Sequence, residues 1–194
     1  MKREKKWQLT DDKIIEGFFE AIRKNKITKF QELTVQLIVQ EAGISKPTFY
    51  THFESIEELL KDIRFKIDEG IPEKLVAFEA DHEQDLVTYV AREILPMLYN
   101  HRDWLKVLYG TAIDPEWHGF LQESYMKFVI RQLKRAKVES YFGYEILALI
   151  IVRNIITLIS VWLTQDEPAT PAIFEEEFIK ILAVSTRDIF ITNK

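Results

Sequence analysis

A short helix that opens on a proline constrains the fold of this chain more than any other sequence feature. Residues 44–53 read ISKPTFYTHF and lie between two amphipathic stretches, LTVQLIVQEAG and ESIEELLKDI. If Ser45 caps a helix, Pro47 falls in its first turn, where a backbone amide has no partner within the helix. The proline therefore predicts a helix start, and the three segments predict consecutive helices.

The two preceding segments carry helix boundaries of their own. Thr10 is expected to cap a first helix that ends near Asn25. Thr34 is expected to cap a second helix, and Gly43 supplies the permissive residue that ends it. No β-hairpin signal occurs along the sequence, so the fold class expected is all-α, with about nine helices in total.

The short helix at 44–53 divides into an inward and an outward face. Phe49 and Phe53 are four residues apart and are expected to anchor it on the first two helices. A glycine turn followed by a short helix with polar side chains has the proportions of a helix-turn-helix, although an ordinary antiparallel helix pair remains an alternative. The outward residues are Lys46, Pro47, Thr48, Tyr50, Thr51 and His52.

The stretch LTVQLIVQEAGISKPTFYTHFESIEELL closely resembles the DNA-binding segment of the TetR family of transcriptional repressors. The resemblance covers residues 10–67, and the residues that carry it are Thr34, Ala42-Gly43, Pro47-Thr48-x-Tyr50-x-His52-Phe53 and Leu59. It implies that Thr34 and Tyr50 contact DNA phosphates. It also implies that Lys46, Pro47, Thr48 and His52 lie at the groove or the backbone, and Ser45 completes the candidate DNA-binding set.

One position departs from the family pattern. A fourth helix is expected from Ser55 and Glu58, which have capping-box spacing. The family usually places a phosphate-contacting lysine in its first turn, whereas this chain has Ile56. That contact is either missing or supplied by the lysines that precede Trp7.

The charge distribution agrees with DNA contact by the N-terminal part of the chain, residues 1–53, which we call the head. The net charge is −5, yet residues 1–53 hold ten Lys and Arg against seven Asp and Glu, so the remaining residues carry −8. The chain has no cysteine, which fits a reducing cytoplasm and removes disulfides and thiolate metal sites. No secretory signal is visible.

The rest of the chain predicts a larger helical body. Helices are expected at 85–101 with a kink at Pro96, at 104–110, at 115–137, in YEILALIIVRNIITLISVWLTQ, and from residue 171 or 173 to about Ile191. Because Arg153 and Asn154 interrupt the apolar helix, burial in a bundle or subunit interface is favoured over a membrane span. Pairing of the last two helices with a second copy, as in the TetR family, predicts a homodimer. The alternative is a monomer whose earlier helices cover the apolar helix.

No catalytic motif or metal-ligand spacing is found, so neither an enzyme nor a cofactor is expected. His82, His101 and His118 have no second ligand at helical spacing. An apolar cavity with a few polar tips is one interpretation of the aromatic segment that follows residue 103, and a filled core is the other. The candidate ligand-pocket residues are Trp104, Tyr109, Trp117, His118, Phe120, Tyr125, Phe128 and Arg153.

Together these features predict a cytoplasmic, ligand-responsive DNA-binding regulator. We expect a helix-turn-helix domain at 1–54 and a ligand-binding and dimerisation domain at 55–194, with helix 55–70 connecting the two. The default expectation is a homodimeric repressor that binds a palindromic double-stranded operator and is released by a small apolar or amphipathic effector. A helical ligand-binding protein or enzyme that keeps the head as scaffold, and a structural interaction module, are the alternatives.

Overall fold

The computed structural model describes residues 2–80 and 85–183, with side chains from Trp7 onward, and its regular structure there is helical. Contacts group the chain into two compact units. The first comprises residues 1–67 and 107–117, and the second comprises 68–106 and 118–194. The first unit thus extends past residue 54 and takes in a later segment, while the functional division at residue 54 stays a prediction.

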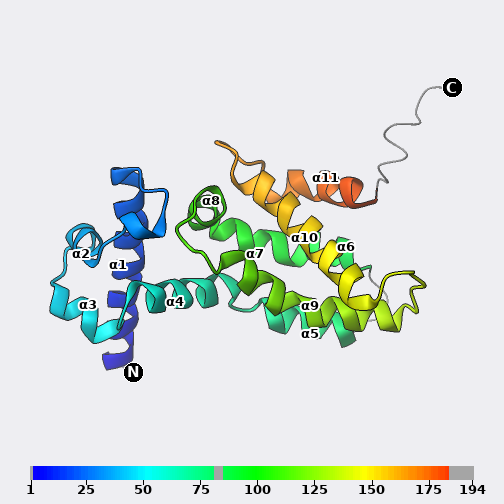
Figure 1. The fold of residues 1–194 in the computed structure, drawn as a ribbon, viewed down its shortest axis with the longest axis horizontal. Helices are drawn as coiled ribbons and strands as arrows, with labels where there is room; N and C mark the ends of the chain where they lie inside the picture. Colours follow the sequence, from blue (N-terminus) through cyan, green and yellow to red (C-terminus); the bar gives the residue numbers. More distant parts are fainter. Residues whose placement is uncertain (1, 81–84, 184–194) are drawn as a thin grey trace. The chain divides into compact units, whose positions relative to one another are not determined.

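The first unit contains four helices, and Figure 1 shows α2 and α3 following α1. They are α1 (Lys2–Asn25), α2 (Val35–Ala42), α3 (Lys46–His52) and α4 (Ile56–Asp68), with a 3₁₀ turn at Phe30–Glu32. Side chains from all four helices meet in one apolar core, which makes the head a packed body. Its fully buried members include Ile14, Phe18, Phe19, Ile38, Phe49, Leu59 and Ile63.

Helix α1 is longer than the sequence predicts. The expectation that Thr10 caps it is wrong, because the helix begins at Lys2 and passes through Thr10 without a break. Lys, Arg, Glu and Gln, which have high helix propensity, fill most of the positions before Thr10. Trp7, in the added turns, packs against the end of α3.

The caps of α2 and α3 are those that the sequence predicts. Thr34 Oγ1 accepts the amide of Leu37 at 3.3 Å, and Gly43 ends α2 with φ 64°. Ser45 Oγ accepts the amide of Thr48 at 3.2 Å. Pro47 lies in the first turn of α3, so the turn between the two helices is built as expected.

The segment 107–117 joins the first unit through backbone and side-chain bonds. The amide of Ala112 donates to the carbonyl of Thr28 at 2.8 Å, and the amide of Phe30 donates to the carbonyl of Ala112 at 3.1 Å. Arg64 of α4 holds Asp114 of the same segment. The first unit therefore contains residues that lie far apart in the sequence.

The second unit holds the remaining helices. They are α5 (Ile71–Ala80), α6 (Leu86–Tyr89), α7 (Leu95–Asn100), α8 (Arg102–Gly110), α9 (Trp117–Arg135), α10 (Tyr144–Leu163) and α11 (Pro171–Ala183). The last four residues of α8 and the first residue of α9 are counted with the first unit. Helix α5 was not expected as a separate helix, because Gly70 and Pro72 read as the end of the fourth. Gly70 has φ 82°, and Pro72 instead lies in the first turn of α5.

The helix expected at 85–101 is present, but Pro96 does not simply kink it. A π-turn at Val90–Ile94 joins α6 to α7, and Pro96 lies in the first turn of α7. Within an α-helix, a proline lacks the amide that would donate a hydrogen bond, and its ring clashes with the carbonyl four residues earlier. The wider π-turn directly before Leu95 accommodates both effects.

Three stacked rings join α7, α10 and α11. The ring of Trp162 stacks on Phe174 at 4.3 Å and on Tyr99 at 5.6 Å, and its indole nitrogen donates to the carbonyl of Ala169 at 2.8 Å. Arg92 adds an ion pair with Glu175 at 2.8 Å. The final helices are thus packed onto the helix at 86–100. The part of the last helix expected beyond residue 183 lies outside the described residues.

Helix α10 passes the length and hydropathy test for a membrane span, although only 28% of its apolar window is buried within the chain. It is the helix that Arg153 and Asn154 interrupt. Arg153 is exposed in the single chain. Its Nη2 lies 3.5 Å from the Gln122 side-chain oxygen, at the limit of a hydrogen bond.

Candidate DNA-binding site

Helix α3 presents its polar side chains from a rigid base. Phe49 is fully buried, and its ring lies 6.0 Å from that of Phe53. Together they fix the inner face of the helix, as the spacing predicts. Ser45 caps the first turn, and Thr51 Oγ1 donates to the carbonyl of Pro47 at 2.8 Å. A seven-residue helix is too short to be stable alone, so this anchoring is what holds it in place.

Most of the expected DNA-binding residues lie at the surface. The ring of Tyr50, which is 55% exposed, meets Phe49 edge-on at 5.5 Å. Thr48 is half-buried, and its hydroxyl shares a 2.8 Å hydrogen bond with that of Ser45, so its methyl group is the part left for an apolar contact. The other exposed members are Thr34, Ser45, Lys46, Pro47 and Thr51.

His52 does not face outward as expected. Its side chain is only 8% exposed, and Nδ1 lies 2.6 Å from an Asp11 carboxylate oxygen on α1. The indole of Trp7 lies over the imidazole at 4.1 Å with a tilt of 43°. The imidazole ties the end of α3 to α1, and a direct DNA contact from His52 stays a prediction. Neither Asp11 nor Trp7 is predicted as part of this site, and the run of helix formers before Thr10 is the sequence signal for the added turns that carry Trp7.

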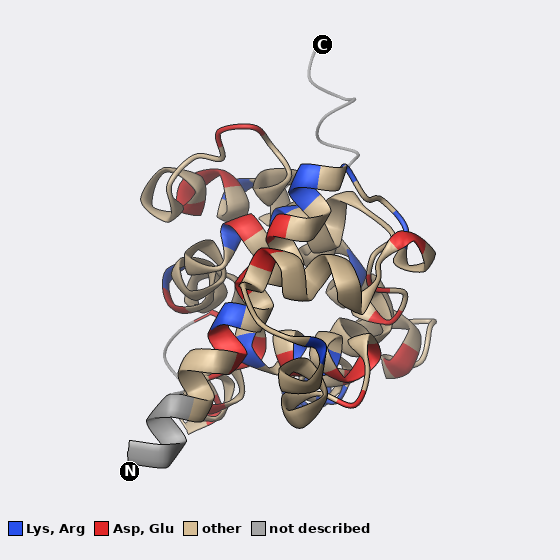
Figure 2. Ribbon diagram, turned by 90° about the vertical axis from the view of Figure 1, so that its left-hand side faces the viewer, with Lys and Arg blue, Asp and Glu red and all other residues tan. Residues whose placement is uncertain are grey.

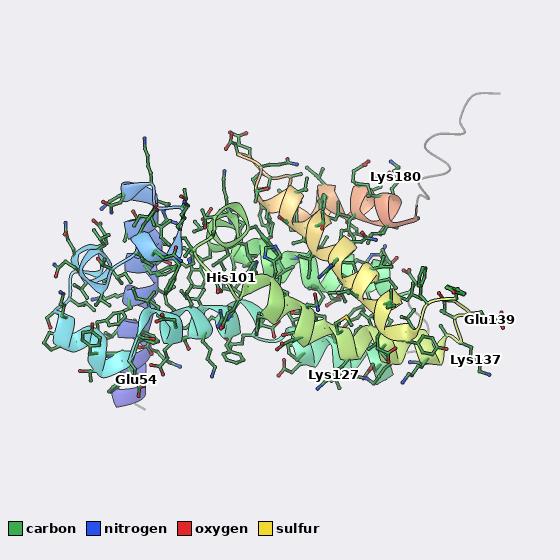
Figure 3. All side chains as sticks on the ribbon, in the orientation of Figure 1. Glu54, His101, Lys127, Lys137, Glu139 and Lys180 are labelled. Carbon is green, nitrogen blue, oxygen red and sulfur yellow. The ribbon has the colours of Figure 1, made fainter. Side chains whose placement is uncertain are left out.

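The first turn of α4 has the capping geometry that the sequence predicts. Ser55 Oγ accepts the amide of Glu58 at 3.2 Å, and the Glu58 carboxylate accepts the amide of Glu54 at 2.6 Å. Glu54 is labelled in Figure 3. Ile56 is half-buried beside the acidic Glu57 and Glu58, so the described side chains of this turn offer no cation to a phosphate.

Several described cations of the first unit are already paired with carboxylates. Lys24 contacts Glu41, and Lys66 lies 2.9 Å from Asp12. Figure 2 shows acidic and basic positions interspersed over the helices seen from that side. Lys46, at the start of α3, is exposed, and its charge is therefore a main candidate for contact with DNA.

The expected ligand-pocket residues fall into both units. Tyr109 and Trp117 belong to the first unit, where their rings meet edge-on at 5.5 Å and burial raises the pKa of the Tyr109 hydroxyl. Trp117 is buried. The remaining six candidates, Trp104, His118, Phe120, Tyr125, Phe128 and Arg153, belong to the second unit.

Within the second unit, these residues make separate local contacts. The ring of Trp104 tilts against that of His101, which is labelled in Figure 3, at a centroid distance of 5.1 Å. Phe128 is buried 6.1 Å from Phe78, as expected of a core residue. Tyr125 donates to Asp68, while Phe120 is half-buried and His118 is exposed. A shared ligand pocket for this set stays a prediction.

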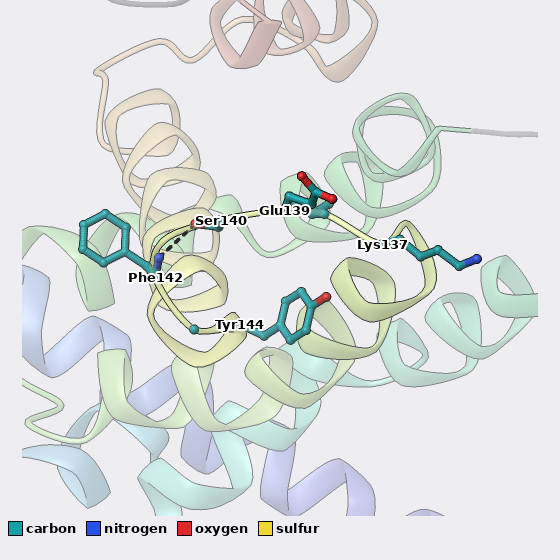
Figure 4. Close-up of a pocket in the computed structure, with 7 residues that line it drawn as sticks. Lys137, Glu139, Ser140, Phe142 and Tyr144 are labelled. Carbon is teal, nitrogen blue, oxygen red and sulfur yellow. Dashed lines mark hydrogen bonds between the residues drawn. The ribbon is translucent and has the colours of Figure 1, made fainter.

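An open cavity of about 410 Å³ lies in the connection between α9 and α10. It is lined by residues of the loop itself, with Lys137, Tyr144 and Phe142 around it in Figure 4. None of the eight candidate pocket residues lines it. Among the described residues, no cluster of three or more His, Asp or Glu side chains is arranged to hold a metal ion.

Comparisons with known proteins agree with the helix-turn-helix geometry. Residues 30–63, which span α2, α3 and the first half of α4, match the family model described as bacterial regulatory proteins, tetR family. No curated protein matches the chain.

One similar solved structure is that of a TetR transcriptional regulator from Streptococcus agalactiae 2603V. It is 20% identical, with a TM-score of 0.61, and the match covers 94% of this chain and 98% of that one. This likeness concerns the fold of nearly the whole chain, and the match to the family model concerns the segment at 30–63. The chain thus carries a segment similar to the DNA-binding part of the tetR family and shares its overall fold with a TetR transcriptional regulator.

Proposed function

We propose that this protein is a homodimeric repressor that binds a palindromic operator and is released by a small apolar or amphipathic effector. The observation that carries the proposal is the outer face of α3, where exposed polar side chains stand on a helix fixed by buried Phe49. Major-groove readers place the first turn of a recognition helix against base edges. Lys46, Pro47 and Thr48 occupy that turn.

The exposed apolar face of α10 supports the dimer. Ile146, Ile150 and Val161 are each exposed by nearly half or more and follow helical spacing along one side of α10. Ile173 and Ile181 are similarly exposed on α11. An apolar surface of this kind is typical of a subunit interface, and a two-fold axis covers both copies at once. We propose that a second copy covers it through the same two helices.

The effector part of the proposal is supported by the aromatic content of the second unit and by the match of residues 30–63 to the tetR family model. A ligand lowers operator affinity if it binds better to a conformation in which the spacing of the two DNA-binding heads no longer fits the operator. The coupling free energy between the two binding events is then about 1–3 kcal/mol. The protein would act in the cytoplasm, where its DNA target lies. The rival function, a ligand-binding scaffold without DNA binding, predicts ligand hits that leave DNA affinity unchanged.

Selection from a random duplex library, followed by mass determination of the complex, tests the proposal. We expect enrichment of a two-fold symmetric sequence with half-sites about one helical turn apart, bound by two chains per duplex or a multiple of two. Val161→Glu should yield monomers with weaker operator binding, because a charge would be placed in the proposed interface. Glu176→Gln, an exposed substitution on α11 that adds no charge, is the control. Enrichment of no sequence at low salt would reject the function.

A further inference from the structure

The C-terminal end of α3 is held to α1 by a directional contact. His52 is the last residue of α3, and its Nδ1 lies 2.6 Å from a carboxylate oxygen of Asp11. Trp7 lies four residues before Asp11 on the same side of α1, and its indole covers the imidazole at a centroid distance of 4.1 Å. Figure 1 shows α3 beside this part of α1. Because the His52 side chain is only 8% exposed, little water competes for the hydrogen bond.

This contact supplies what the apolar packing of α3 does not. Phe49 and Phe53 are buried and hold α3 on the core, but such packing is non-directional. A hydrogen bond is restricted in both distance and angle, so the Asp11 carboxylate fixes the direction of the helix end. Side chains that read bases must also meet hydrogen-bond geometry, so a small change in the direction of α3 would weaken several DNA contacts at once.

The charge of Asp11 is unfavourable for a surface that meets DNA. Burial is the main reason that the pKa of Asp62 is raised, and the nearby carboxylates of Asp11, Asp12 and Glu58 add to this effect, while Lys66 opposes it. The junction of α1, α3 and α4 therefore gathers carboxylates. On electrostatic grounds alone, removal of one of them should strengthen binding to a polyanion. A carboxylate here that strengthens DNA binding must act through the group that it holds.

We propose that Asp11, His52 and Trp7 form a positioning cluster that sets the direction of α3 for DNA binding, so that an acidic residue of the head raises operator affinity. The inference rests on the proposed function, because it concerns the same contact with DNA. Asp11 orients the imidazole, and Trp7 covers the bond between them. This role differs from the phosphate contact that the sequence predicts for His52, and the two roles predict different salt dependence.

The first test uses the duplex that the wild type enriches from a random library, with affinities of full-length variants measured by fluorescence anisotropy. Asp11→Ala removes the charge and the bond, whereas Asp11→Asn keeps an oxygen that can accept from the imidazole. Glu16→Ala, at an exposed position of α1, is the control for charge. We expect Asp11→Ala to bind about tenfold more weakly, a typical loss for a hydrogen bond to a charged group. Asp11→Asn should recover most of that loss, and Glu16→Ala should bind at least as tightly as the wild type.

A double-mutant cycle separates the cluster from a general loss of stability. If Asp11 and His52 act together, Asp11→Ala/His52→Ala should bind no more weakly than the weaker single variant. Trp7→Ala changes no charge and should weaken binding about threefold, in line with the contribution of one ring contact. Leu9→Ala, at a more exposed apolar position of α1, should have no effect. Titration at saturating concentrations gives the active fraction of each variant, so partial unfolding is not counted as weaker binding.

Two further measurements distinguish positioning from direct contact. In His52→Ala the slope of log affinity against log salt should stay unchanged, whereas loss of a charged phosphate contact would make it shallower by about 1 per subunit. The amide of Phe53 donates to the carbonyl of Phe49 at 2.9 Å at the end of α3. Without DNA, hydrogen exchange at this amide should be faster in Asp11→Ala than in Glu16→Ala, because the helix end is released.

An Asp11→Ala variant that binds as tightly as the wild type, or more tightly as electrostatics predicts, would overturn the inference. Additive losses from Asp11→Ala and His52→Ala, a shallower salt slope in His52→Ala, or unchanged exchange at Phe53 would do the same. If Asp11→Ala does not fold, Trp7→Ala and Leu9→Ala decide, and equal affinities of these two would reject the cluster. In all these cases the wild type still binds its operator and the proposed function stands. A wild type that enriches no duplex would instead reject the function, and the inference with it.

Discussion

Arg64 donates from one guanidinium nitrogen to both carboxylate oxygens of Asp114, at 2.7 and 3.0 Å. The Asp114 side chain is 1% exposed, and the second nitrogen of Arg64 lies 2.9 Å from Glu116. The pair joins α4 to the segment at 107–117, which comes from a distant part of the sequence. A charge buried this deeply requires its partner, so the pair holds that segment in the head.

Asp114→Asn should lower the free energy of unfolding by about 3–5 kcal/mol, because it leaves the buried Arg64 without its main counter-charge. Denaturant unfolding followed by circular dichroism measures the change. Asp166→Asn, which breaks an exposed pair with Lys106, is the control and should have no measurable effect. Equal stability of the two variants would show that the Arg64 pair is not needed to hold the segment.

Gly17 lies where α1 packs closely against α2, and of the described glycines it leaves the least room for a side chain. A Cβ added there would lie 2.6 to 2.9 Å from the Cβ and backbone atoms of Ala42. Gly17→Ala should therefore cost about 1–3 kcal/mol, since the backbone of α2 must shift. Gly119→Ala, in α9 with open space around it, should instead be neutral or stabilise the protein by up to about 1 kcal/mol. Thermal unfolding of both variants checks the contrast, and a harmless Gly17→Ala would contradict the helix packing.

Asp68 gives the stability of the second unit a defined pH dependence. Burial is the main reason that the pKa of its carboxyl group lies above the usual 3.8, despite the hydrogen bond from Tyr125. In the unfolded chain the Asp68 carboxyl group loses its proton at a lower pH than in the folded protein. The protonated carboxyl group therefore contributes to folding stability below about pH 4, and this contribution is lost as the pH rises through the pKa of the folded state.

Asp68→Asn removes that titration while keeping an oxygen that can accept from Tyr125. The variant should therefore gain stability relative to the wild type as the pH rises from about 4 to 7, as measured by urea unfolding at several pH values. Asp103→Asn, at an exposed position in α8, should show no such trend. A difference between Asp68→Asn and wild type that stays constant with pH would contradict the assignment.

Within α3, Tyr50 and Lys46 should contribute to DNA binding in different ways. The Tyr50 ring is held at the flank of the helix by Phe49, so its hydroxyl suits a phosphate, and Tyr50→Phe should weaken binding by a similar factor on every operator variant. Lys46→Ala should cost about 1–3 kcal/mol on the preferred operator and relax preference at one or two base pairs. Titration of each variant against single-base operator changes decides between the two roles, and the reverse pattern would refute them.

The helix-turn-helix could be predicted from the sequence because its signals are local. Ser45, Pro47 and Gly43 each act within one turn of the backbone, so the cap and turn rules place α2 and α3 correctly. The spacing of Phe49 and Phe53 likewise sets the buried face without knowledge of the rest of the fold.

Features that depend on distant contacts could not be predicted in the same way. The local pattern predicts an outward-facing His52. Its actual partner, Asp11, lies 41 residues away on α1, so no local signal indicates the contact. The position of Asp114 beside Arg64 depends on how the chain returns to the head 50 residues later. Helix α5 was missed because Pro72 reads equally well as the end of one helix or the start of the next.

Footprinting on genomic fragments, with the wild type and Lys46→Ala side by side, tests the central claim most directly. At low salt the wild type should protect two half-sites about one helical turn apart, with a saturating isotherm and two chains per site or a multiple of two. Lys46→Ala should need a higher concentration for the same protection. If the wild type instead protects no discrete region, or protects a single asymmetric site as a monomer, the account of this protein as a dimeric operator-binding regulator is contradicted.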